Sequence, residues 1–228
     1  MRNLGLILIL AASLVLAYAM LPVFRPSSES SRPITDMPWQ ITPTADGSIT
    51  VFGLTLGEST LADAVSKLGH RYDLGLFREA DGRVSLEAYF KDALLGGMNA
   101  RLVLALSVAP EPAAAMLARS GNGKSRDGGV EQFSVAEADV PAALATPIES
   151  LTYVPYFKLP RDLALERFGN PAERLVTGDE STHWLYPNRG LDLVLGPDGQ
   201  AILQYTPPRD FDRLREPLYA PAANADAS

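Results

Sequence analysis

The residues that could do chemistry are few, and two histidines come first among them. His70 and His183 are the only histidines of the chain. Histidine is the side chain whose charge most readily changes near neutral pH. A catalytic histidine needs a nucleophile or an orienting carboxylate within reach. Asp179 and Glu180 lie near His183 in sequence, but no accompanying motif completes a catalytic set. We therefore expect structural or surface roles for both histidines and predict no catalytic residue.

One segment resembles the end of a phosphate-binding loop. Residues 121–125 read Gly-Asn-Gly-Lys-Ser. The full motif also needs an earlier glycine, a strand before it and a helix after it. That earlier position is Ala118, and the preceding segment favours a helix. Residues 120–129 are therefore predicted to form a flexible, solvated loop, with no bound nucleotide and no cofactor.

Metal and nucleophile motifs are also incomplete. The chain has no cysteine, which excludes disulfides, thiolate zinc sites and a cysteine nucleophile. Asp46, Asp81 and Asp198 each precede a glycine, a pattern typical of tight turns and not of calcium ligation. Residues 57–61 resemble a nucleophile elbow, but Leu61 stands where its closing glycine is required. The sequence predicts no metal site.

The charge of the chain argues against nucleic acid as a partner. Acidic residues number 27 and basic residues 20, which gives a formal net charge of −7. Two of the arginines, Arg2 and Arg25, flank an uncharged segment at the amino terminus, so the rest of the chain is more acidic still. Binding to a phosphate backbone depends on clustered basic residues that release counterions. We expect no nucleic-acid binding.

Aromatic residues near the carboxyl terminus are the candidate binding residues. Trp184 and Tyr186 point to one face of their predicted strand, and Tyr205 lies in the last predicted strand. If the leucines of residues 191–195 pack under the helix of residues 160–168, these rings could form an exposed protein-binding surface, because Trp and Tyr favour interfaces. In the alternative interpretation they belong to the core, where large aromatic residues of strands usually pack.

The amino terminus predicts a membrane connection. Residues 4–24 carry no charge, and 21 helical residues span ~31 Å, close to the thickness of a bilayer's hydrocarbon core. Residues 1–25 are therefore interpreted as an uncleaved signal anchor. The alternative is a signal peptide cleaved after Ala19, because Ala17-Tyr18-Ala19 fits the small-x-small pattern. Either interpretation favours a body outside the cytoplasm: a single-pass inner-membrane protein with a periplasmic body, or a protein secreted to the periplasm.

The rest of the chain divides by composition and by element pattern. The short apolar runs and turn signals predict an α+β fold, with helices too few for a parallel sheet. Residues 26–38 are rich in proline and serine and are interpreted as a linker. The further divisions are a first α+β unit (39–109), a connecting segment (110–147), a second α+β unit (148–215) and a disordered tail (216–228).

A helix followed by strands occurs twice. Residues 59–69 and 159–169 each predict a short helix that ends at glycine, 100 residues apart. Each unit is expected to pack its helix on an antiparallel sheet of three or four strands. The predicted strands are 39–41, 49–54, 72–77, 84–90, 101–108, 130–135, 174–176, 182–186, 191–195 and 201–205. The other predicted helices are 112–119, 139–145 and 210–215.

The second unit resembles a known family. Gly169-Asn170-Pro171 ends the helix, Trp184-Leu185-Tyr186 follows, and residues 190–195 (Gly-Leu-Asp-Leu-Val-Leu) and 198–202 (Asp-Gly-Gln-Ala-Ile) come after it. This order resembles the BamE/SmpA family of small outer-membrane assembly proteins. Two such units in one chain are similar to the tandem layout of the β-lactamase-inhibitor-protein fold. The chain departs from the assembly family because it has no cysteine to carry a lipid.

The resemblance implies a non-enzymatic, protein-binding role. With the anchor, the linker and the incomplete catalytic motifs, it leads to the hypothesis of a membrane-tethered envelope protein that binds another envelope protein in assembly or as a scaffold. Two alternatives remain open at this point. The first is a periplasmic module that binds a small molecule or a lipid, and the second is a hydrolase that uses carboxylates and one histidine.

Overall fold

The computed structural model describes residues 35–219. The predicted anchor, its alternative cleavage site at Ala19, and most of the linker lie outside these residues, as does the end of the tail. Between Thr35 and Tyr219 the structure contains no helix long and apolar enough to cross a membrane.

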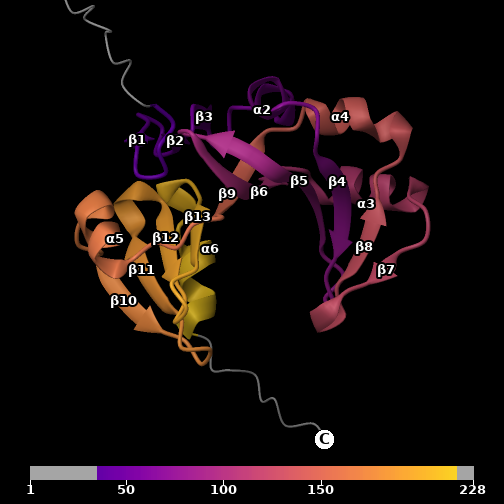
Figure 1. The fold of residues 1–228 in the computed structure, drawn as a ribbon. Coiled ribbons are helices and arrows are strands. Elements are labelled where there is room, and N and C mark those ends of the chain that lie inside the picture. Colours follow the sequence, from indigo (N-terminus) through magenta and orange to yellow (C-terminus); the bar gives the residue numbers. More distant parts are fainter. Residues whose placement is uncertain (1–34, 220–228) are drawn as a thin grey trace, which may run out of the picture. The chain divides into compact units, whose positions relative to one another are not determined.

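The described residues form an α+β fold, as the sequence predicts (Figure 1). The strands are β1 Ile41–Pro43, β2 Ile49–Val51, β3 Leu54–Thr55, β4 Asp73–Arg78, β5 Val84–Leu95, β6 Met98–Leu106, β7 Lys124–Ser125, β8 Glu131–Ser134, β9 Ile148–Pro155, β10 Glu173–Val176, β11 Thr182–Tyr186, β12 Leu191–Leu195 and β13 Ala201–Tyr205. The α-helices are α2 Leu61–Leu68, α3 Pro110–Arg119, α4 Val140–Leu144, α5 Arg161–Phe168 and α6 Asp212–Arg215. The 3-10 helices are η2 Asp127–Gly129, η3 Glu137–Asp139, η4 Pro187–Arg189, η5 Pro208–Asp210 and η6 Glu216–Tyr219.

Ten of the strands form one antiparallel sheet. Its order is β10-β11-β12-β13-β9-β6-β5-β4-β8-β7, and β1, β2 and β3 form a separate three-stranded sheet. Strands from both predicted units therefore hydrogen-bond into the same sheet, with β9 pairing to β6 on one side and to β13 on the other.

The central strand β9 is missing from the sequence-based prediction. Leu151 and Tyr153 point into the core, and Thr152 and Val154 alternate with them at intermediate exposure. The register between β6 and β9 shifts between Ala105 and Leu106. This irregularity interrupts the alternation of buried and exposed residues at the start of β9. An unbroken alternation would have indicated a strand.

One face of the large sheet carries the hydrophobic core. Leu102, Tyr153 and Leu203 lie directly opposite one another on β6, β9 and β13, and all three are at most 1% exposed. Opposed residues of an antiparallel pair project to the same face. Helices α2 and α5 bury their apolar residues in this core, as does the small sheet, whose neighbouring Phe52 ring lies 5.0 Å from the ring of Tyr153.

Helices α2 and α5 end in the same way, as their sequences predict. Each has eight residues. The amide of Gly69 donates to the Val65 carbonyl at 2.8 Å, and that of Gly169 donates to the Leu165 carbonyl at 2.9 Å. Both glycines have positive φ, 93° and 75°, a conformation that residues with a Cβ rarely adopt. The glycines therefore end the helices and turn the chain toward the sheet.

The second face of the sheet is partly covered. Leu185 and Asp192 point to the face opposite the core, because each is adjacent in its strand to a core residue. They are nevertheless 0% and 1% exposed. In Figure 1, α6 lies beside β12 and β13 on the side away from α5, and Phe211 at its start is buried. The carboxyl-terminal segment thus shields the second face at β11 and β12.

Three predicted segments differ in the structure. The predicted loop 120–129 contains β7, which pairs with β8, and η2. The end of the predicted linker packs on the body: the Tyr205 hydroxyl donates to the Pro38 carbonyl at 2.7 Å. The start of the predicted tail is ordered as η6, where the Tyr219 hydroxyl donates to the Glu173 carboxylate. Pairing with the nearby strand β8 orders the first segment, and contacts with residues distant in sequence order the other two.

Candidate functional site

The second face of the sheet remains open over β4, β5 and β6. We call this surface the open face, and its residues are Phe77, Ser85, Glu87, Tyr89 and Val103. They alternate along their strands with core residues and are half-buried. Tyr89 lies opposite Val103, and Phe77 lies opposite Ser85, so the strand pairing brings these side chains together. The open face therefore combines aromatic rings, apolar side chains and one carboxylate.

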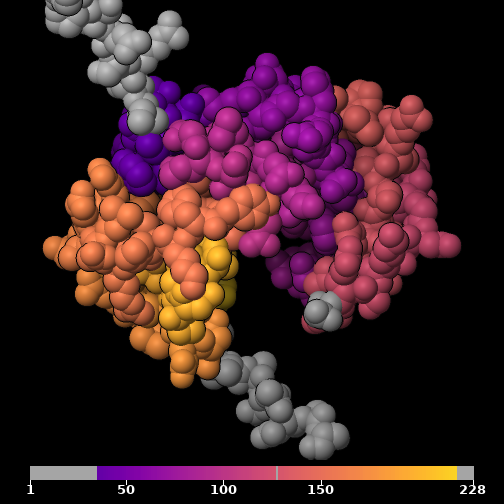
Figure 2. Space-filling view, in the orientation of Figure 1, coloured from indigo at the N-terminus to yellow at the C-terminus, as the bar shows by residue number. Residues whose placement is uncertain are grey.

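A pocket of about 450 Å³ opens on this face, and Phe77, Glu87, Tyr89 and Val103 line it. Figure 2 shows the molecule hollowed on this side, between the yellow carboxyl-terminal segment and the strands around β4. Gly75, opposite Glu87, helps to keep the space open. A Cβ at Gly75 would approach the Phe77 ring to 3.2 Å, so a larger residue would displace the ring.

Glu87 is the electrostatic centre of the pocket. Its carboxylate accepts a hydrogen bond from the Ser85 hydroxyl at 3.3 Å. Burial raises the pKa of Glu87, the bond from Ser85 lowers it, and repulsion from Glu79 raises it further, with the net shift upward. Among residues 35–219, no lysine or arginine forms an ion pair with Glu87. The pocket therefore holds a half-buried carboxylate that forms no ion pair with the described residues.

Arg126 and Asp73 are the other charged residues of the pocket. The Arg126 guanidinium donates to the Gln132 side-chain carbonyl, with an Nε distance of 2.8 Å. The Gln132 side chain thus holds the Arg126 guanidinium, and Glu87 has no ion-pair partner among the described residues. Two carboxylates and one guanidinium line the pocket, so its formal charge is negative when all three are ionised.

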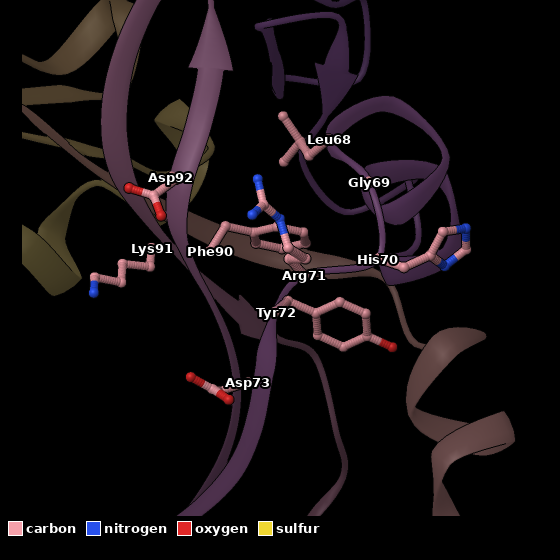
Figure 3. Close-up of a pocket in the computed structure, with 9 residues that line it drawn as sticks. All are labelled: Leu68, Gly69, His70, Arg71, Tyr72, Asp73, Phe90, Lys91 and Asp92. Atoms are coloured by element: carbon pink, nitrogen blue, oxygen red, sulfur yellow. The ribbon is translucent and has the colours of Figure 1, made fainter.

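A second pocket, of about 500 Å³, adjoins the first and shares Asp73 with it (Figure 3). It lies between the end of α2 and the irregular part of β5, where the register shifts after Phe90. The rings of Tyr72 and Phe90 stack at 5.3 Å. His70 is exposed, and in Figure 3 it points away from the acidic side chains. The geometry thus gives His70 no orienting carboxylate.

The other histidine is paired with a residue that the sequence did not indicate. His183 Nδ1 lies 2.8 Å from Asp192 Oδ2. The two side chains are 13% and 1% exposed. The neighbouring acids of the sequence, Asp179 and Glu180, instead lie in the turn before β11, where Asp179 accepts from the Ser181 amide. No serine or threonine of the described residues hydrogen-bonds to His183, so the pair lacks a nucleophile in contact.

The predicted aromatic surface is buried. Trp184, Tyr186 and Tyr205 are 4%, 5% and 0% exposed, so their rings do not present a protein-binding face, and the core interpretation fits the burial. The reason is register: Trp184 lies opposite Leu193, so the aromatic residues and the leucines share a face instead of occupying opposite ones. The Tyr186 hydroxyl donates to the Gly169 carbonyl at 2.9 Å, which ties β11 to the end of α5.

No group of three or more histidine, aspartate or glutamate side chains within residues 35–219 is arranged to hold a metal ion. The segment that resembles a phosphate loop also lacks the required context, because Lys124 and Ser125 lie in edge strand β7 and a 3-10 helix follows them. Comparison with known proteins gives no match to any family model, curated protein or solved structure.

The open face was missed by sequence reasoning. Its signal is present in β5, where Ser85, Glu87 and Tyr89 alternate with three core residues. This alternation predicts a strand with one polar face. It does not indicate whether another element covers that face, which is decided by the position of the carboxyl-terminal segment over β11 and β12.

Proposed function

We propose that this protein is a non-catalytic, membrane-tethered cell-envelope protein that binds another envelope protein through the open face of its sheet. The observation that carries the proposal is the pocket of about 450 Å³ on that face. It combines half-buried Phe77 and Tyr89 with the unpaired carboxylate of Glu87. Aromatic anchors beside a few polar groups are typical of the centre of protein interfaces.

We also propose that the chain contains two structurally related units. Helix α2 with β4–β6 and helix α5 with β10–β13 have the same order of elements, and both helices pack on the core face. In the sheet, β4 and β10 lie on opposite sides of the β9 and β13 pair and run in opposite directions. This is the arrangement expected of two copies related by a twofold axis perpendicular to the sheet. It supports the proposal that two related units follow one another in the chain.

We infer the location from the amino-terminal sequence. The uncharged segment of residues 4–24 favours an inner-membrane anchor with the body in the periplasm. Cleavage after Ala19 would instead release the body into the same compartment. In both cases the open face would meet envelope proteins.

A second candidate function is the binding of a small molecule or a lipid. The pocket volumes of about 450 and 500 Å³ fall within the ~300–1,000 Å³ of typical ligand pockets. Native mass spectrometry of the protein from its own host discriminates the two functions. A bound small molecule would favour this second function, and a bound protein would favour the first.

The protein-binding proposal is tested by filling the pocket from the solvent side. Val103 lines the pocket, so Val103→Trp should block it without disturbing the opposite core face. Val176→Trp is the matched control, because Val176 lies on edge strand β10 and is 73% exposed. The measurement is co-purification of the full chain from membranes of its host.

We expect the wild type and the Val176→Trp variant to retain one envelope protein in constant proportion, and the Val103→Trp variant to lose it. If both variants retain the same protein equally, the open face is not the binding surface.

A further inference from the structure

We propose that the pocket of the open face takes a cationic side chain, arginine or lysine, of the bound partner. This inference rests on the proposed function and names the chemistry of the partner at the contact. Glu87 would be the counter-ion, and the rings of Phe77 and Tyr89 would flank the aliphatic and cationic parts of the side chain.

The charges of the pocket favour a positive occupant. Asp73 and Glu87 contribute two carboxylates, while the Arg126 guanidinium is hydrogen-bonded to Gln132. Asp73 is exposed to solvent, whereas Glu87 is half-buried. A half-buried carboxylate is disfavoured unless a charge or a hydrogen bond compensates its lost hydration, and Ser85 supplies one long bond. A cation from a partner would supply the missing compensation.

The aromatic residues favour the same occupant. This chain often places arginine over aromatic rings: Arg174 lies 4.6 Å from the centre of the Trp184 ring, and Arg78 lies 5.2 Å from that of Phe133. Within residues 35–219, no arginine or lysine lies over Phe77 or Tyr89. These two rings are therefore available for a cation that comes from outside the chain.

The net charge of the protein also favours a positively charged partner. The acidic excess of the whole chain, 27 acidic residues against 20 basic ones, would attract a partner segment that carries positive charge. An acidic or phosphorylated segment would instead meet repulsion at Glu87 and Asp73. The aromatic lining of the pocket and the sign of its charge thus favour the same class of side chain.

The test uses N-acetyl-arginine amide as the probe and N-acetyl-citrulline amide as its neutral counterpart of similar shape. Binding to the full chain in detergent micelles is measured by saturation-transfer NMR. We expect the arginine probe to bind, and Glu87→Gln to weaken its binding by about tenfold, as for the loss of one charge-assisted contact. Glu111→Gln, at an exposed position of helix α3, is the control and should leave binding unchanged.

The outcomes separate this inference from the proposed function. Equal binding of the arginine and citrulline probes, or equal binding to the wild type and the Glu87→Gln variant, overturns the cationic occupant. If the arginine probe binds through Glu87 while Val103→Trp leaves co-purification intact, the cation pocket stands and the proposed docking surface fails. If co-purification depends on the pocket but the arginine probe does not bind through Glu87, the docking surface stands and its cationic chemistry fails.

Discussion

Glu87 and Asp192 are both poorly solvated carboxylates on the second face of the sheet, but their surroundings differ. Asp192 is buried beneath the carboxyl-terminal segment and contacts His183 at 2.8 Å. Glu87 lies in a pocket, and among residues 35–219 its carboxylate accepts a side-chain hydrogen bond from Ser85 alone. A group whose environment disfavours its charged form lowers the stability of the fold. Such a residue is often retained for binding, where stability is exchanged for function.

The ionised Glu87 side chain should lower the free energy of unfolding of the protein. Its pKa in the folded protein is raised above the usual 4.5, mainly by burial. Above the pKa of the unfolded state, ionisation of the carboxylate disfavours the folded state, whereas at a pH below both pKa values the group is protonated in both states and the penalty vanishes. Glu87→Gln, which resembles the protonated form, should therefore raise the free energy of unfolding at pH 7 and not at about pH 3.

Urea unfolding of the full chain in detergent at the two pH values measures this difference, with Glu111→Gln as the exposed control. A Glu87→Gln variant that is no more stable than the wild type at pH 7 would show that the carboxylate is adequately solvated or compensated in the folded protein.

At the scale of elements, the glycines that end α2 and α5 provide a matched pair. A Cβ added at Gly69 or Gly169 would meet no atom within 4 Å, so a substitution tests backbone conformation alone. Gly69→Ala and Gly169→Ala should each lower the free energy of unfolding by about 1–3 kcal/mol. The measurement is chemical denaturation.

Gly121→Ala is the control for this pair, because Gly121 also has open space around it and no positive φ. It should change stability by less than about 0.5 kcal/mol. Similar losses for Gly69 and Gly169 would support equivalent helix ends in the two proposed units. A loss at only one of them would show that these positions are not energetically equivalent.

The elements themselves were largely predictable from local patterns, whereas their pairing was not. The apolar spacing of Leu61, Ala64 and Val65 indicates α2, and the three Asp-Gly pairs mark hairpins that the structure contains. The open face was not predictable, because no local pattern shows that the carboxyl-terminal segment covers β11 and β12 and leaves β4–β6 uncovered. The face of Trp184 was uncertain for a different, local reason: it is set by the register across the short β11–β12 connection.

At the scale of the whole described body, the continuous sheet predicts cooperative unfolding. Strand β9 hydrogen-bonds to both halves, and Trp39, near the start of the body, lies against Phe168 of α5. Tryptophan fluorescence reports on Trp39 and Trp184, and far-ultraviolet circular dichroism reports on the backbone. Both should give one coincident transition. Separate transitions would indicate that the two halves unfold independently.

Photo-crosslinking in intact cells shows whether the open face contacts another envelope protein. A photoreactive amino acid at Tyr89 would lie in the pocket, and one at Val176, on exposed edge strand β10, provides the control. We expect one dominant envelope protein to be crosslinked from position 89 and to be absent from position 176. No crosslinked protein from position 89, or the same set of proteins from both positions, would contradict it.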